Sequence, residues 1–170
     1  MNGNAIFPPP NIDARKFRAA LGMFPTGVAV VTADGPDGNR IGMTITSFNS
    51  VSLDPPLILF SIGKNCLSLA SLAQATHYSI NILGEDHQHL STRFSRALED
   101  KWSGVEVRSH PELPFTLSDS IATFQCSQYA QHDGGDHIIF VGRVLRIERK
   151  DVARPLVFFS GRYGAVASAA

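Results

Sequence analysis

Short hydroxyl side chains are concentrated in residues 42–57, which read Gly-Met-Thr-Ile-Thr-Ser-Phe-Asn-Ser-Val-Ser-Leu-Asp-Pro-Pro-Leu. Strands usually prefer bulky β-branched and aromatic residues. Small groups such as Thr44 and Thr46 would let a flat polar ligand approach the backbone. Pro55 and Pro56 fix φ and donate no amide hydrogen bond, so they end the segment. An edge strand rich in serine and threonine can have this composition without any ligand, and composition alone does not separate the two readings.

Residues 61–68, Ser-Ile-Gly-Lys-Asn-Cys-Leu-Ser, have the residue types of an anion-binding loop. A strand is expected to end at the glycine, and a helix is expected to begin near Ser68. A helix N-terminus offers free amide donors and partial positive charge, which suits a phosphate, and Lys64 adds a full charge. Simple capping of the helix by Asn65 or Ser68 is the alternative, and this segment alone favours capping.

The histidines indicate no metal site. His87 and His89 are two residues apart on a predicted helix, so their side chains point apart. His132 and His137 flank a predicted turn, but no cysteine or carboxylate set completes a zinc site. A lone histidine at the position of His137, in the sequence Gly-Asp-His, is more often structural than functional.

The composition predicts one globular domain without a macromolecular anion as partner. The chain has 170 residues, 44% hydrophobic and 18% charged, and its 15 basic and 15 acidic side chains cancel. No net field therefore attracts nucleic acid. Cys66 and Cys126 are far apart and indicate reduced thiols rather than a disulfide. No signal peptide and no apolar run of about 20 residues is present, so a cytoplasmic protein without membrane contact is expected. Rossmann and P-loop glycine motifs are absent.

The predicted elements are mostly strands. Residues 1–11 are expected to be a flexible tail, and 12–170 a single domain. Asp13 is expected to cap a helix with Phe17, Leu21 and Phe24 on one face. Strands are predicted at 28–32, 40–48, 57–62, 77–83, 105–109, 121–132, 137–149 and 156–160, with short helices at 67–75 and from 85 onward. Turn residues at 35–38 and 133–136 predict hairpins, and 111–115 is expected to be irregular. Many antiparallel strands with few helices indicate a barrel.

The segment 42–57 closely resembles the short-chain NAD(P)H:flavin oxidoreductases, which are the reductase components of two-component flavin monooxygenases. Other motifs follow in the family order: Phe-Pro-Thr-Gly-Val at 24–28, Asn-Ile-Leu at 81–83, Asp-Lys at 100–101, Gly-Asp-His at 135–137 and Gly-Arg-Tyr-Gly at 161–164. Each motif is weak alone, and the ordered set is specific. The resemblance implies an FMN-binding split barrel, which is antiparallel, Greek-key-like and mainly β with a few helices.

The resemblance also implies a set of site residues. Those expected to bind FMN or FAD are Thr26, Thr44, Ile45, Thr46, Ser47, Ser61, Lys64, Asn65, Ser68 and Lys101. Those expected to bind NAD(P)H are His137, Arg162 and Tyr163. His137 is the catalytic candidate because it would place the nicotinamide, and it is not assigned as an obligatory proton donor. Lys64 and Ser68 depart from the usual family residues in the phosphate loop. Trp102 replaces the usual phenylalanine, and it either covers the flavin or packs in the core.

The implied activity is NAD(P)H-dependent flavin reduction, with hydride passing from the nicotinamide C4 to the flavin N5. Reduced FMN or FAD would be supplied to a partner flavin-dependent monooxygenase, and a homodimer is expected. A split barrel that stores or senses flavin, or binds haem, is the main alternative, although the Gly-Asp-His element argues against it. A pyridoxamine-phosphate-oxidase-like activity is a second alternative. It would need basic side chains for a second phosphate, which these segments do not supply.

Overall fold

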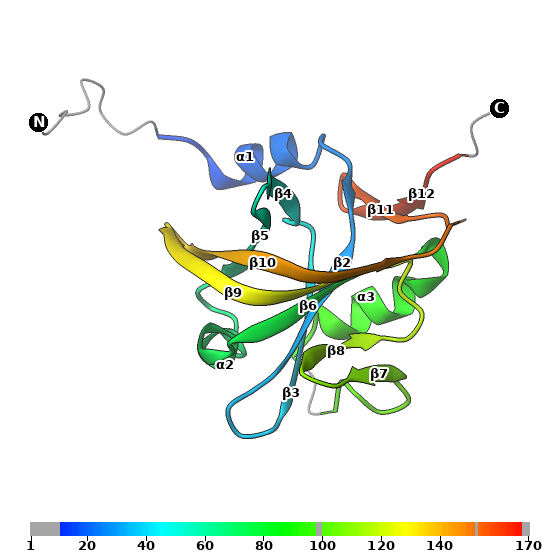
Figure 1. Ribbon diagram of the computed structural model, residues 1–170. Coiled ribbons are helices and arrows are strands. Elements are labelled where there is room, and N and C mark those ends of the chain that lie inside the picture. The colour runs from blue at the N-terminus through cyan, green and yellow to red at the C-terminus, as the bar shows by residue number, and fades with distance from the viewer. Residues whose placement is uncertain (1–10, 98–99, 152, 168–170) are drawn as a thin grey trace, which may run out of the picture.

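The computed structural model describes residues 11–97, 100–151 and 153–167, which form a mainly β fold (Figure 1). The largest sheet is antiparallel with seven strands in the order β3-β2-β6-β9-β10-β5-β4. These strands are β2 (Ala29–Asp34), β3 (Arg40–Ile45), β4 (Asn49–Leu53), β5 (Pro56–Gly63), β6 (His77–Ile82), β9 (Ala122–Gly134) and β10 (His137–Arg149). The prediction of an antiparallel, mainly β chain is confirmed. The expected tail at 1–11 lies, apart from Asn11, outside the described residues.

Two smaller sheets accompany the large one. A three-stranded sheet has the order β1-β11-β12, and β7 pairs with β8. Their strands are β1 (Thr26–Gly27), β7 (Val107–His110), β8 (Leu113–Leu117), β11 (Leu156–Phe159) and β12 (Arg162–Ala165). Figure 1 shows β11 and β12 on the same side of the large sheet as α1 (Ala14–Leu21), and the β7–β8 hairpin on the opposite side.

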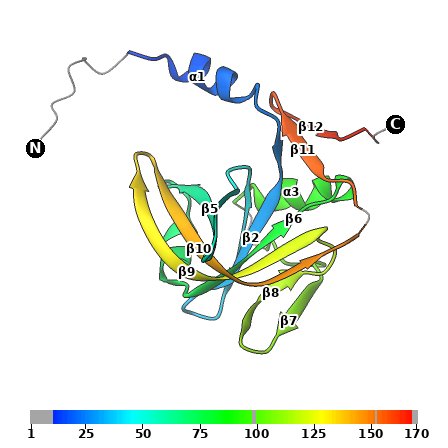
Figure 2. The same ribbon diagram turned by 45° about the horizontal axis from the view of Figure 1, so that its top comes forward.

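The β9–β10 hairpin spans the molecule and curves strongly along its length (Figure 2). Its turn consists of Gly135 and Asp136, and Gly135 has a φ of 80°, which glycine adopts without strain. The predicted strand 137–149 is confirmed at both ends. In the pairing of β10 with β5, His137 lies opposite Gly63, so the hairpin tip lies beside the end of β5.

The helices are short. They are α1, α2 (Leu69–Gln74) and α3 (Gln88–Phe94), with a 3-10 turn at Glu85–His87 before α3. Leu72 and Phe94 are buried, as expected for inward positions. Among the described residues, no helix is long and apolar enough to cross a membrane.

The helix α1 begins as predicted but does not bury its apolar face in this chain. The carboxylate of Asp13 accepts hydrogen bonds from the amides of Arg15 and Lys16, which caps the helix. Phe17 and Leu21 are nevertheless more than half exposed. Figures 1 and 2 show α1 projecting from the barrel. Helical periodicity identifies an amphipathic helix, but it does not identify the surface that covers it.

Three predicted boundaries are wrong. The strand expected at 40–48 ends at Ile45, and residues 49–53 form a separate strand, β4, which pairs with β5. The segment at 111–115, expected to be irregular, enters strand β8. The chain does not end with the strand at 156–160, because Ser160 and Gly161 take positive φ values of 48° and 77° and turn the chain back into β12. Such a turn with positive φ at both central residues is typical of hairpins.

Candidate functional site

A cavity of about 780 Å³ lies between β3, β5 and the segment that follows α3. Cavities of about 300–1,000 Å³ are typical of small-molecule sites. The lining residues are Met43, Thr44, Ile45, Thr46, Ser47, Ser61, Ile62, Gly63, Asn65, Cys66, Leu67, Ser68, Phe94, Ser95, Arg96, Ala97, Lys101 and His137. They include the cations of Arg96 and Lys101 but no carboxylate from the described part of the chain, which suits an anionic ligand.

The cavity lies at the seam where the large sheet closes on itself. In that sheet β3 is an edge strand that pairs with β2. Beyond the last residue of β3, the hydroxyl of Ser47 bridges to β5. It accepts a hydrogen bond from the Ser61 amide (2.9 Å) and donates one to the Ser61 carbonyl (3.1 Å). The Ser47 side chain therefore links the two sides of this seam, as backbone pairing between two strands would otherwise do.

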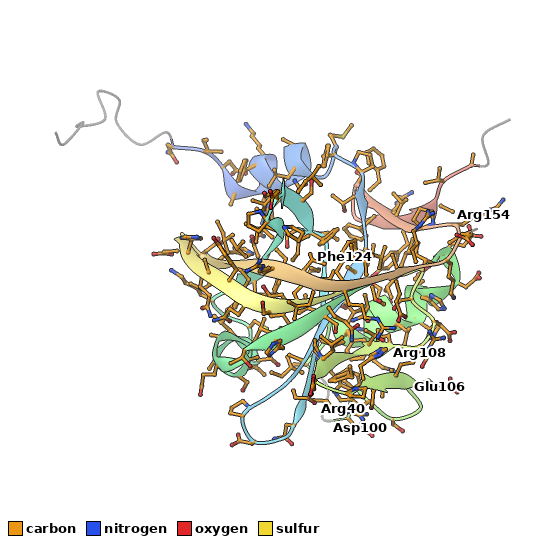
Figure 3. All side chains as sticks on the ribbon, in the orientation of Figure 1. Arg40, Asp100, Glu106, Arg108, Phe124 and Arg154 are labelled. Carbon is orange, nitrogen blue, oxygen red and sulfur yellow. The ribbon has the colours of Figure 1, made fainter. Side chains whose placement is uncertain are left out.

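Trp102 and Lys101 cover part of the open edge of β3. The Trp102 Nε1 donates to the carbonyl of Arg40 (3.0 Å), and the Lys101 ammonium lies 3.4 Å from the carbonyl of Gly42. The carboxylate of Asp100 holds this turn by accepting from the amides of Trp102 and Ser103. Figure 3 shows Arg40 and Asp100 at the same edge of the molecule.

The next backbone groups on that edge face the cavity. In an antiparallel strand, alternate residues direct both their N–H and their C=O to the same side. Because the carbonyls of Arg40 and Gly42 face Trp102 and Lys101, the backbone groups of Thr44 point the same way. Thr44 lines the cavity, so its amide and carbonyl are available to a ligand. Its hydroxyl is already used, since it donates to the carbonyl of Ser91 (2.7 Å).

The loop after β5 and the tip of the β9–β10 hairpin form the mouth of the cavity. A Cβ atom placed on Gly63 would lie 2.9 Å from the Asn65 Oδ1 and 3.7 Å from the His137 Nε2. The glycine therefore leaves space that a side chain would fill. The Nδ1 of His137 lies 2.6 Å from the carboxylate of Asp136, so the opposite nitrogen, Nε2, faces Gly63. The hydrogen bond and charge of His137 lower the pKa of Asp136.

A backbone bond and an ion pair fasten the loop to the hairpin. The amide of Lys64 donates to the carbonyl of Asp136 (2.8 Å), and the ammonium of Lys64 lies 2.7 Å from the carboxylate of Asp133. The hydrogen bond from Lys64 and its charge lower the pKa of Asp133. The ammonium of Lys64 is thus directed to the hairpin rather than into the cavity.

Comparison with known proteins identifies the family. Residues 21–167 match the model of the flavin reductase like domain. The chain belongs to the flavin reductase family. The FMN reductase (NADH) SmoA of Agrobacterium fabrum is 44% identical over 167 residues, which cover 96% of this chain and 92% of that protein. The reductase subunit HsaB of a flavin-dependent monooxygenase from Rhodococcus jostii is 38% identical, over 89% of this chain and 77% of HsaB.

Solved structures of flavin reductases share the fold. The NADH:FAD oxidoreductase SgcE6 of Streptomyces globisporus, crystallised with NAD and FAD fragments, superimposes with a TM-score of 0.86 at 30% identity. The match covers 92% of this chain and 94% of that one. The prediction of a flavin reductase fold of the split-barrel type is confirmed.

The flavin reductase domain brings most of the predicted site residues together. The cavity is lined by Thr44, Ile45, Thr46, Ser47, Ser61, Asn65, Ser68, Lys101 and His137. Four predicted residues do not line it. Thr26 lies on β1, and Arg162 and Tyr163 lie on β12, within the three-stranded sheet, while Lys64 pairs with Asp133. Contact of each residue with a ligand stays a prediction.

Some lining residues of this flavin reductase domain were not predicted. Cys66 and Leu67 lie within the predicted phosphate loop, and Phe94 was expected only to pack inward. Arg96 is an exposed cation two residues after α3. Its position after this helix is the only feature of the sequence that could have indicated a role in the site. Trp102 packs edge-on against Phe94 at 4.8 Å, which supports its packing role.

Within residues 11–97, 100–151 and 153–167, no group of three or more histidine, cysteine, aspartate or glutamate side chains is arranged to hold a metal ion.

Proposed function

We propose that the protein is an NAD(P)H-dependent flavin reductase that reduces FMN or FAD and supplies reduced flavin to a flavin-dependent monooxygenase. One observation carries the proposal: the open backbone edge at Thr44 faces a cavity whose mouth carries His137. The names of the relatives support it, since SmoA is an FMN reductase using NADH and HsaB is a reductase subunit.

The residues around the cavity fit a flavin. The rim of the flavin ring has both donors and acceptors, and the edge of β3 offers an amide and a carbonyl at Thr44. Ile45, Leu67 and Phe94 supply apolar surface for a flat ring. The polar side chains of Asn65 and Ser68, with Lys101 and Arg96, suit a phosphate. Bound flavin supplies an N5 atom that accepts hydride from a reduced nicotinamide.

The residues of this chain contribute alignment and charge stabilisation. The fixed amide of Thr44 at the edge of β3 would stabilise negative charge without reorganising, because hydrogen bonds to β2 hold the strand in place. Asp136 fixes the orientation of the His137 ring, so its Nε2 is directed toward the cavity mouth. We assign His137 to placement of the nicotinamide. Arg162, an exposed cation of β12, is the proposed contact for the phosphates of the dinucleotide.

We also propose a cytoplasmic homodimer. Large apolar side chains are exposed on α1, β4 and β10, among them Phe17, Leu21, Leu53 and Ile147, and Phe24 is exposed just after α1. A second copy would remove this apolar surface from water, which favours association. Light scattering during gel filtration measures the oligomeric state directly. A monomer at micromolar concentration would contradict the proposed dimer.

Anaerobic mixing of the purified protein with FMN or FAD and NADH tests the proposed function. Rapid loss of the visible absorbance of oxidised flavin, with turnover of excess flavin, is the expected result for a reductase. Flavin binding without bleaching would instead indicate a storage module. No flavin binding would overturn the proposal altogether. Repeating the reaction with NADPH gives the nicotinamide preference.

A further inference from the structure

Ser91 of α3 joins three segments of the chain by hydrogen bonds. Its side chain is fully buried. Its carbonyl accepts from the hydroxyl of Thr44 (2.7 Å) and from the amide of Ser95 (3.1 Å). Its hydroxyl lies 2.8 Å from the hydroxyl of Tyr163, which is 72 residues later in the sequence. Ser91 therefore connects the edge strand of the cavity, the end of α3 and the C-terminal hairpin.

Two of these three partners line the cavity. Thr44 forms part of its floor on β3, and Ser95 begins the wall that continues through Arg96 and Ala97. Tyr163 does not line the cavity. Its ring instead packs edge-on against Phe158 at 5.3 Å, beside the hydrophobic cluster that contains Phe94. Among the described residues, the Tyr163 hydroxyl is linked to the cavity through its hydrogen bond with Ser91.

We propose that Tyr163 is a positioning residue of the flavin site, which it serves by holding Ser91 and thereby the register of α3 against β3. The inference rests on the proposed function. Loss of the Tyr163 hydroxyl leaves the buried Ser91 hydroxyl to bond within its own helix or to lose its partner. Either change loosens the Ser91 carbonyl that orients Thr44 and Ser95, and both residues line the cavity. This role differs from contact with the nicotinamide.

The neighbouring hydroxyl on α3 provides a matched control. Thr92 donates to the carbonyl of Gln88 within the same helix (3.0 Å), and it is not among the residues that line the cavity. Thr92→Ala removes a hydroxyl from α3 as Ser91→Ala does, but it leaves the connection between β3 and β12 intact.

The test is titration of flavin fluorescence in the absence of nicotinamide, using the full-length protein with Tyr163→Phe, Ser91→Ala, the double variant and Thr92→Ala. We expect Tyr163→Phe and Ser91→Ala each to weaken FMN binding about three- to tenfold. The double variant should bind as weakly as either single variant, because both changes break the same link. Thr92→Ala should bind like the parent. In turnover, the KM for flavin should rise while kcat at saturating flavin stays unchanged.

Several outcomes would overturn the inference. Parent-like flavin affinity in Tyr163→Phe, with a lower melting temperature, would make the contact merely structural. A raised KM for NADH without a change in flavin binding would assign Tyr163 to the nicotinamide. Additive losses in the double variant would show two independent contributions. If the parent itself neither binds nor reduces flavin, the proposed function fails, whereas normal binding by the parent and all variants rejects only the role of Tyr163.

Discussion

The ammonium of Lys64 lies 2.7 Å from the carboxylate of Asp133, and this pair joins the loop after β5 to the hairpin that carries His137. Both side chains are substantially exposed, at 43% and 75%. The loop is the proposed phosphate site, and the hairpin is the proposed nicotinamide site. A cation of the loop at the first site is therefore held by an anion of the hairpin at the second.

The first prediction concerns competition for Lys64. If Lys64 binds the flavin phosphate, its ammonium must leave Asp133, so Asp133→Asn should free it and strengthen FMN binding severalfold. Riboflavin, which has no phosphate, should bind the parent and Asp133→Asn equally. Lys64→Ala should weaken FMN binding about tenfold or more, through loss of a charge-assisted contact. Fluorescence titration with both ligands measures each effect. Equal changes for FMN and riboflavin would limit Lys64 to holding the hairpin.

The second prediction concerns His137. Its replacement by alanine should raise the KM for NADH and slow hydride transfer about tenfold or more, since alignment of the nicotinamide is lost. Flavin affinity should change little. Stopped-flow reduction at several NADH concentrations separates the saturation constant from the limiting rate. Asp136→Asn is the companion variant, because it keeps the size of the partner and removes its charge. Unchanged rate and saturation in His137→Ala would leave the residue a structural role.

The third prediction concerns the seam at Ser47. Ser47→Ala removes the hydroxyl that both accepts from and donates to the backbone of Ser61. Each such bond contributes about 0.5–1.5 kcal/mol, so we expect a loss of roughly 1–3 kcal/mol in the free energy of unfolding. Flavin binding should weaken as well, because Ser47 and Ser61 both line the cavity. Urea unfolding measures the first effect. Ser50→Ala, at an exposed position of β4, is the control, and an equal loss there would reject the role of the seam.

The fourth prediction concerns acid sensitivity at His87. Burial lowers the pKa of His87, and the charges of His89 and Lys150 lower it further, whereas Asp119 and Asp86 raise it. The unfolded chain therefore binds a proton at His87 before the folded chain does. The contribution of neutral His87 to the free energy of unfolding is fully present above the ordinary histidine pKa of about 6.5. It is lost as the pH falls through the lower pKa that His87 has in the folded protein.

The measurement is the melting temperature at pH 7.5 and pH 5.5. His87→Gln should reduce the difference between the two, because glutamine does not titrate and still offers an acceptor to the Gly84 amide, which lies 3.3 Å from the His87 Nδ1. His89→Gln, which removes one of the charges that lower the pKa of His87, should reduce the acid sensitivity less than His87→Gln does. If His87→Gln keeps the pH dependence of the parent, the loss of stability at low pH comes from other groups.

Local sequence patterns predicted most helices and strands well. They did not predict contacts between segments that are far apart in the chain. The hairpin at 133–136 follows from its own turn residues, and the structure places His137 at the first residue of β10. By contrast, the covering of the Arg40 and Gly42 carbonyls depends on side chains about 60 residues later in the chain, which no periodicity reveals. The position of Tyr163 behind Ser91 depends on β12, a strand that the sequence did not predict.

The partly covered edge of β3 has a consequence for the protein without its ligand. Two of its outward carbonyls face Lys101 and Trp102, and the next position, Thr44, stays open toward the cavity. An exposed strand edge is a template on which another chain can add a strand. A flat molecule with donors and acceptors along one rim occupies that template as an additional strand would. A flavin bound there would cover this edge, and we therefore expect the ligand-free protein to self-associate through β3 more readily than the loaded protein.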